Sequence, residues 1–85
     1  MKEFSYTIKD ELGIHARPAG LLVKQASKFN SAIIIEKDDK KGDAKKIFSV
    51  MGLGVKSGDT ITVRTQGEDE EDAKNAILSF LEENL

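Results

Sequence analysis

The chain has 85 residues, of which 39% are hydrophobic and 33% charged, and these values are typical of one small globular domain. It contains no cysteine, and no apolar run approaches the about 20 residues of a membrane span, so we expect neither disulfides nor direct membrane insertion. The net charge of −2 and the few aromatic residues argue against binding to nucleic acid. Met1 opens a polar segment rather than a signal peptide, so residues 1–85 are expected to form a single cytoplasmic domain.

The first predicted elements are a strand and a helix. Residues 4–8 alternate between hydrophobic and polar side chains, as in a half-buried strand. Pro18 lacks an N–H group and is tolerated in the first turn of a helix but not in its interior, so a helix is expected from about residue 16 to about residue 28. Its inward positions recur at helical spacing, at Ala19, Leu22, Val23, Ala26 and Phe29 or Asn30.

The remaining elements follow in quick succession. Residues 32–36 form a β-branched run, and the polar turn at 37–42 would fold it back onto a short strand at 41–44. A short helix is expected at 46–53, ended by Gly52 or Gly54, then a strand at 60–65 and a final helix at 69–85 with acids in its first turn. This β-α-β-β-α-β-α order predicts an α+β two-layer sandwich, in which a four-stranded antiparallel sheet is covered on one face by three helices.

The single histidine, His15, falls at or just before the start of the first helix. Unpaired N–H groups and the positive end of the helix dipole converge there, at Ala16 to Pro18, and favour an anion such as phosphate. The planar guanidinium of Arg17 suits phosphate oxygens. A solvent-exposed imidazole is mostly neutral at pH 7, so a ring nitrogen keeps a free lone pair and needs no partner base. The cluster predicts a phosphoryl-handling site.

A lone histidine can also have roles other than phosphoryl transfer. In an arbitrary small domain a lone histidine is more often an ordinary surface or core residue. One histidine and no cysteine cannot supply the usual ligands of zinc, so no metal and no cofactor is expected. The joint placement of His15, Arg17 and Pro18 at a helix start, after the flexible Gly13, favours the phosphoryl site.

Residues Gly13 to Ala19 resemble the active-site motif of the HPr family, the histidine-containing phosphocarriers of the bacterial phosphoenolpyruvate-dependent sugar phosphotransferase system. The resemblance extends to residues 47–55 and to the acidic segment 67–70. It implies an open-faced sandwich and a phosphoryl carrier rather than an enzyme. It also implies that His15 is phosphorylated by enzyme I, at Nδ1, and dephosphorylated by sugar-specific A components, with Arg17 as the phosphate partner.

The second predicted helix carries three apolar side chains, Ile47, Phe48 and Met51, which we expect to be partly exposed as a docking patch. The alternative for Ile47 and Phe48 is a place in the core. The resemblance implies that Gly20, Leu21 and Lys24 complete the patch around His15.

The charges of the chain are unevenly distributed. Residues 68–85 carry a net charge of −6, which leaves +4 for the rest of the chain. Much of this positive charge lies near the site, where it is expected to steer an acidic partner. The basic residues concerned are Arg17, Lys24, Lys28, Lys45 and Lys46.

One position departs from many Gram-positive members of the family. They open the second helix with a serine that a dedicated kinase phosphorylates, whereas this chain has Lys46 there. Without a hydroxyl group that modification cannot occur, so we expect the kinase-driven switch toward catabolite repression to be absent. Ser49 or Ser57 is the alternative target, although an unmodified serine is the simpler interpretation.

Two other functions are compatible with this sequence. One is an HPr-like regulatory module that docks on transcriptional regulators or metabolic enzymes. The other is a carrier in a nitrogen-related branch that transports no sugar. A small domain that exchanges many partners through one face is expected to be a monomer.

Overall fold

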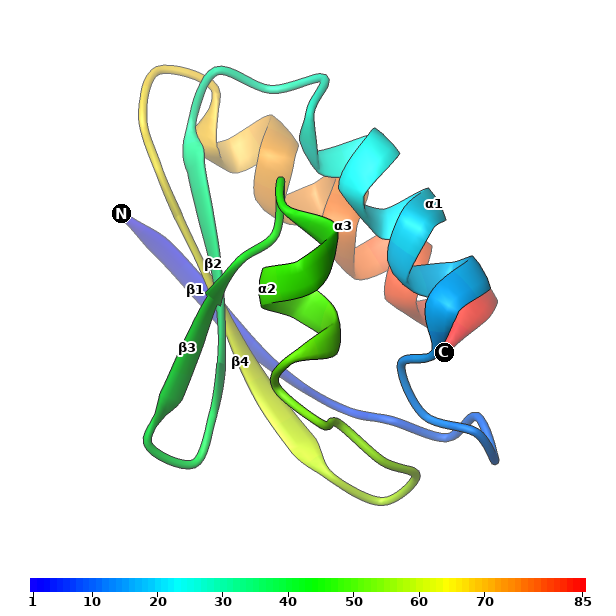
Figure 1. Ribbon diagram of the computed structural model, residues 1–85. Helices are drawn as coiled ribbons and strands as arrows, with labels where there is room; N and C mark the ends of the chain where they lie inside the picture. Colours follow the sequence, from blue (N-terminus) through cyan, green and yellow to red (C-terminus); the bar gives the residue numbers. More distant parts are fainter.

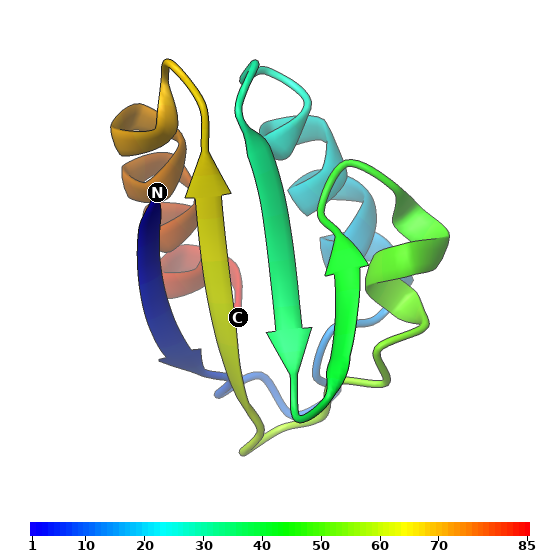
Figure 2. The same cartoon turned by 90° about the vertical axis from the view of Figure 1, so that its left-hand side faces the viewer.

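The computed structural model describes residues 1–85 as four strands and three helices. In chain order they are β1 (Lys2–Thr7), α1 (Ala16–Ala26), β2 (Ala32–Lys37), β3 (Lys40–Asp43), α2 (Ile47–Met51), β4 (Thr60–Gln66) and α3 (Glu70–Asn84). The strands pair antiparallel in the order β1-β4-β2-β3. All three helices cover one face of the sheet and leave the other open, which confirms the predicted α+β open-faced sandwich (Figures 1 and 2).

The boundaries differ from the predicted ones at the ends of the elements. Helix α1 ends at Ala26 rather than near Lys28, because the N–H groups of Lys28 and Phe29 donate to carbonyl groups three residues back in a tighter turn. Helix α2 is also shorter than predicted. It is followed directly by Gly52 as its C-cap, and the chain then reverses at Gly54, which has a φ of +63°.

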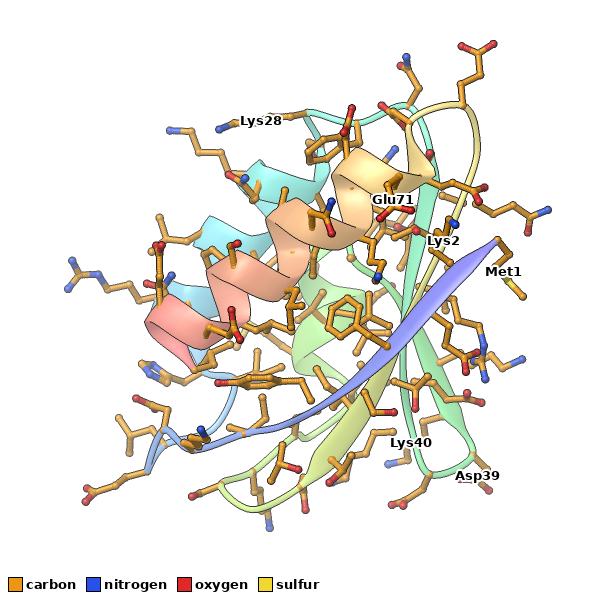
Figure 3. The ribbon with its side chains drawn as sticks, turned by 180° about the vertical axis from the view of Figure 1, so that it is seen from behind. Met1, Lys2, Lys28, Asp39, Lys40 and Glu71 are labelled. Atoms are coloured by element: carbon orange, nitrogen blue, oxygen red, sulfur yellow. The ribbon has the colours of Figure 1, made fainter.

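The hairpin between β2 and β3 is tighter than predicted. Only Asp38 and Asp39 separate the two strands, and Asp38 adopts a φ of +55°, a conformation that aspartate tolerates better than most residues. Figure 3 shows Asp39 and Lys40 at the tip of this hairpin. Strand β3 therefore begins at Lys40, one residue before the predicted start.

The core lies between the sheet and the helices. Alternate residues of β2 and β4 point inward, and Ile33, Ile35, Ile61 and Val63 are fully buried. The helices contribute buried residues at the spacing predicted from sequence: Ala19, Leu22 and Ala26 from α1, and Ala73, Ile77 and Leu81 from α3. Val23, Phe29 and Phe80 pack partly buried against this cluster. None of the helices is both long and apolar enough to cross a membrane.

Polar pairs cover the open face of the sheet. Arg64 of β4 donates to Glu3 of β1 and to Glu36 of β2, and the bond to Arg64 lowers the pKa of Glu36. The hydroxyl groups of Thr7 and Thr60 lie 2.9 Å apart across β1 and β4. A sheet with one solvated face needs such side chains, because only its other face packs on a core.

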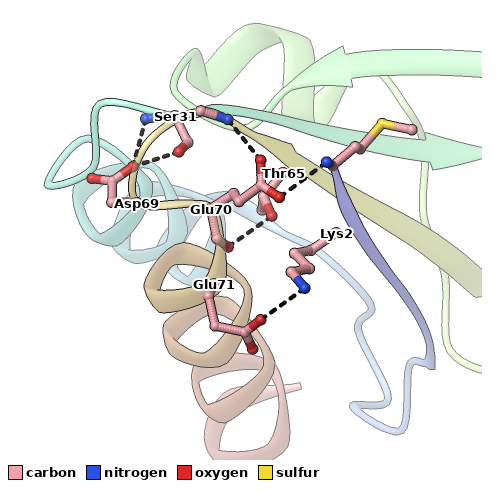
Figure 4. Close-up of polar contacts among 8 residues, drawn as sticks. Lys2, Ser31, Thr65, Asp69, Glu70 and Glu71 are labelled. Atoms are coloured by element: carbon pink, nitrogen blue, oxygen red, sulfur yellow. Dashed lines mark hydrogen bonds and ion pairs between the residues drawn. The ribbon is translucent and has the colours of Figure 1, made fainter.

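The acidic start of α3 ties the helix to the strands beside it (Figure 4). The carboxylate of Asp69 accepts the N–H groups of Asn30 and Ser31 at 2.9 Å, and the hydroxyl of Ser31 also donates to it. These hydrogen bonds hold the pKa of Asp69 below its usual value, with the Ser31 hydroxyl as the largest cause. Lys2 of β1 forms an ion pair with Glu71 at 3.2 Å. The acids at this helix start thus make specific contacts in addition to their favourable position at the helix dipole.

Candidate functional site

The loop between β1 and α1 is held in place at Gly13. This residue is buried and has a φ of +68°, and its N–H donates to the carbonyl of Asp10 at 3.0 Å. A Cβ atom at Gly13 would lie 2.3 Å from the carbonyl oxygen of Val55 and 2.7 Å from Cα of Lys56. The next residue, Ile14, is buried and donates its N–H to the same Val55 carbonyl at 3.1 Å. The backbone that leads into His15 is therefore fixed against the segment before β4.

His15 is the N-cap residue of α1. Its backbone is extended, with φ −105° and ψ −177°, and its carbonyl accepts the N–H of Ala19 at 2.9 Å. No side chain caps the helix. Pro18 has no N–H to leave unpaired, so the N–H groups offered to an anion in this first turn come from Ala16 and Arg17. The structure places His15, Arg17 and Pro18 together at a helix start, as the sequence predicts.

The ring of His15 is 39% exposed and lies in a shallow hollow of about 220 Å³. The hollow is lined by His15, Arg17, Pro18, Leu21 and Asn84. Two larger hollows lie elsewhere, one of about 290 Å³ on the open face of the sheet and one of about 450 Å³ beside the C-terminal end of α3. The smallest of the three hollows is therefore the one that contains His15 and Arg17.

Two residues near the ring were not predicted from sequence. The carboxylate of Asp10 lies 3.6 Å from Nε2 of His15, and Asn84 comes from the end of α3. Figure 1 shows why Asn84 lies near the ring: the C-terminal end of α3 lies beside the beginning of α1. Asp10 precedes His15 by five residues, and a search for acids near the histidine would have found it. No local pattern would have found Asn84, because its proximity depends on the packing of α3.

The predicted docking patch lies on α1 and α2, which pack against each other. Its large apolar members are exposed: 86% for Phe48, 44% for Leu21 and 39% for Met51. Ile47 is half-buried and packs on the core cluster. The alternative that Ile47 and Phe48 fill the core is therefore correct in part for Ile47, and it is wrong for the exposed Phe48. Gly20 brings the backbone of α1 close to Ile47, since a Cβ atom there would lie 3.9 Å from its Cδ1. Lys24 is exposed.

The basic residues are less concentrated around the site than predicted. The ammonium group of Lys45 donates to the carbonyl of Phe29 at 2.7 Å, so this half-buried side chain is tied to the fold. Lys28 lies beyond the C-terminal end of α1, as Figure 3 shows, whereas His15 lies at the other end. Arg17, Lys24 and Lys46 remain as exposed cations on or beside α1 and α2.

Lys46 is the N-cap residue of α2, and its side chain makes no capping hydrogen bond. The position that opens this helix thus carries an exposed ammonium group and no hydroxyl group. Ser49 lies within the helix and is half-buried, whereas Ser57 is exposed in the turn before β4. No group of histidine, cysteine, aspartate and glutamate residues is arranged to hold a metal ion.

Comparison with known proteins extends over almost the whole chain. The model of the PTS-HPr family, described as the PTS HPr component phosphorylation site, matches residues 2–83. The chain is 46% identical over 82 residues to the HPr-like protein Crh of Halalkalibacterium halodurans, which covers 96% of this chain and 98% of that protein. It is 45% identical over 85 residues to phosphocarrier protein HPr of Mycoplasma genitalium, which covers 99% of this chain and 97% of that protein.

Solved structures agree with these relatives. HPr of Thermoanaerobacter tengcongensis matches with a TM-score of 0.93 and 48% identity, covering 96% of this chain and 92% of that chain. Crh of Bacillus subtilis, described as a swapped dimer, matches with a TM-score of 0.79 and 38% identity, covering 94% and 92%. Because dimers occur among these relatives, the predicted monomer stays a prediction. The fold, the helix start at His15 and the match over residues 2–83 together show that this chain belongs to the HPr family of phosphotransferase-system components.

Proposed function

We propose that this chain carries a phosphoryl group on Nδ1 of His15, accepting it from phosphorylated enzyme I and passing it to sugar-specific A components. The observation that carries the proposal is the position of His15, a partly exposed imidazole at the uncapped start of α1 with Arg17 in the same hollow. The proposal includes a single domain over residues 1–85, a cytoplasmic location and a monomeric state. In this relay the chain is a substrate and a donor rather than an enzyme.

The chemistry follows from the residues at the helix start. The lone pair of Nδ1 attacks the phosphorus atom in line with the bond to the donor, and that bond breaks as the new P–N bond forms. Charge spreads over the equatorial oxygens in this transition state. We expect the guanidinium of Arg17 and the N–H groups of Ala16 and Arg17 to stabilise this charge, because they belong to the helix start that carries His15. A phosphoramidate formed on an exposed ring is accessible to the next acceptor.

The proposal is tested by reconstituting the relay from purified proteins. The chain is mixed with phosphoenolpyruvate, enzyme I and a panel of A components, and phosphate on each A component is measured with and without the chain. We expect transfer to at least one A component, and only when the chain is present. If enzyme I phosphorylates a control carrier but leaves this chain unmodified, the result contradicts the carrier function. It would then favour the regulatory alternative.

Replacing Arg17 with alanine is expected to slow phosphoryl acceptance by about tenfold to a hundredfold, which corresponds to the loss of one charged hydrogen bond of about 1.5–3 kcal/mol. Arg17 is exposed and forms no ion pair in the protein, so the fold should be unaffected. Rapid-quench kinetics at saturating enzyme I measures the effect. Lys28→Ala is the matched control, because it removes an exposed cation beyond the far end of α1. Equal rates for the two variants would exclude Arg17 from the transfer step.

Replacing Phe48 with alanine is expected to raise the KM for enzyme I by about tenfold or more, with little change in kcat, since a central aromatic anchor contributes about 2 kcal/mol to an interface. The side chain is 86% exposed, so its loss should not destabilise the fold. The control is Ile34→Ala, which shortens an apolar side chain on the open face of the sheet. A KM that rises equally in both variants would contradict docking through α1 and α2.

A second candidate function is favoured by the relatives themselves. The 46% identity to an HPr-like protein Crh supports a regulatory module that docks on transcriptional regulators or metabolic enzymes. The presence of both His15 and Arg17 favours the carrier, and Lys46 removes the serine that the kinase-driven switch needs. A carrier of a nitrogen-related branch would phosphorylate A components that transport no sugar, so the panel in the relay experiment should include both kinds.

A further inference from the structure

A carboxylate lies beside the ring nitrogen that is not phosphorylated in the proposed relay. Oδ2 of Asp10 is 3.6 Å from Nε2 of His15, and the exposed fractions of the two side chains are 36% and 39%. The proposed function uses His15 and Arg17 but gives Asp10 no role.

The position of Asp10 is fixed by the backbone around it. Its Oδ2 accepts the N–H of Leu12 at 3.1 Å, and its carbonyl accepts the N–H of Gly13 at 3.0 Å. Its own N–H donates to the carbonyl oxygen of Leu85 at 2.9 Å. One hydrogen bond holds the carboxylate itself, and two others fix the backbone that carries it, which is unlike a flexible surface acid.

A negative charge close to Nε2 favours the form of the imidazole that carries its proton on that nitrogen. In a neutral ring, Nδ1 then holds the lone pair. We propose that Asp10 is a positioning residue that keeps the proton of His15 on Nε2 and so presents Nδ1 as the phosphoryl acceptor. This inference rests on the proposed function for its purpose, but the proton position is a property of the unphosphorylated protein.

The transfer step balances without another acid or base. The electron pair of Nδ1 forms the bond to phosphorus, and the pair of the broken bond leaves with the donor. The ring keeps its proton on Nε2 and gains a positive charge, which the carboxylate of Asp10 faces and stabilises. When an acceptor attacks the phosphorus, the P–N pair returns to Nδ1 and the ring becomes neutral again. Arg17 lines the hollow that contains His15 and would bind the negatively charged phosphoryl oxygens. Asp10 would instead stabilise the positive charge of the ring.

The test is ¹⁵N NMR of the His15 ring in the unphosphorylated protein at about pH 9, where an imidazole is neutral. The nitrogen shifts give the ratio of the Nε2–H form to the Nδ1–H form. We expect Asp10→Asn to lower this ratio by about twofold to fivefold, the size of a weak interaction between an exposed carboxylate and a neutral N–H group. Asparagine keeps an acceptor for the N–H of Leu12, so the turn is preserved.

Glu11→Gln is the matched control, because it removes the same charge from the neighbouring exposed residue. It should leave the ratio unchanged. If Asp10→Asn perturbs the fold, Asp10→Ser replaces it, since a hydroxyl group can also accept the N–H of Leu12. A ratio that is the same in the parent and in the Asp10 variants would overturn the proposal. Because no phosphoryl donor is present, failure of the relay and failure of this inference are observed separately.

Discussion

Replacing His15 with alanine is expected to abolish phosphoryl acceptance, with no residual transfer above the background without enzyme I. The chain has no other histidine, so no second imidazole can take over the group. The side chain is partly exposed and does not cap α1, so the free energy of unfolding should change by only about 0.5 kcal/mol. Intact-mass analysis and thermal unfolding of the same preparation measure both effects.

The matched control for this variant is Ser49→Ala. It should still acquire the phosphoryl group, and the group should still be lost in acid, as expected of a phosphoramidate and not of a phosphoserine. Phosphate that persists in His15→Ala would place the modification elsewhere in the chain.

Replacing Gly13 with alanine is expected to destabilise the protein by about 3 kcal/mol. A φ of +68° costs an alanine about 1 kcal/mol, and the new methyl group would overlap the carbonyl of Val55 and Cα of Lys56, which adds about 2 kcal/mol. Relief of this overlap moves the loop that leads into His15, so phosphoryl acceptance should fall as well. Urea unfolding measures the first effect, and the initial rate with enzyme I measures the second.

Gly54→Ala separates the two causes. Gly54 has nearly the same backbone angle, with a φ of +63°, but nothing lies within 4 Å of a Cβ atom there. Its variant should lose only about 1 kcal/mol and keep its rate of phosphoryl acceptance. If both glycine variants lose the same stability, the close contact between Gly13 and Val55 does not hold the loop.

Periodic patterns predicted the architecture because each element buries one face. The spacing of Ala19, Leu22 and Ala26 gave the inward side of α1, and the alternation in β1 together with the β-branched run of β2 predicted strands of the sheet. The ends of the elements were less predictable, since they depend on single hydrogen bonds. Residues 27 and 28 were expected to be helical and instead form a tighter turn.

The helix start at His15 was predictable because Pro18 marks it, and the structure places His15 and Arg17 there together. The surroundings of the ring were not predictable in the same way. Asn84 reaches the hollow only through the packing of α3, and Lys45 is withdrawn from the surface by a hydrogen bond to Phe29. Both depend on contacts between segments that are distant in the sequence.

The proposed function depends on a transferable phosphoryl group carried by His15. The most direct measurement is the intact mass of the parent protein and of His15→Ala after incubation with phosphoenolpyruvate and enzyme I. We expect one acid-labile phosphoryl adduct on the parent and none on the variant. An unmodified parent, in a mixture where enzyme I phosphorylates a control carrier and circular dichroism shows the chain folded, would contradict the proposed function.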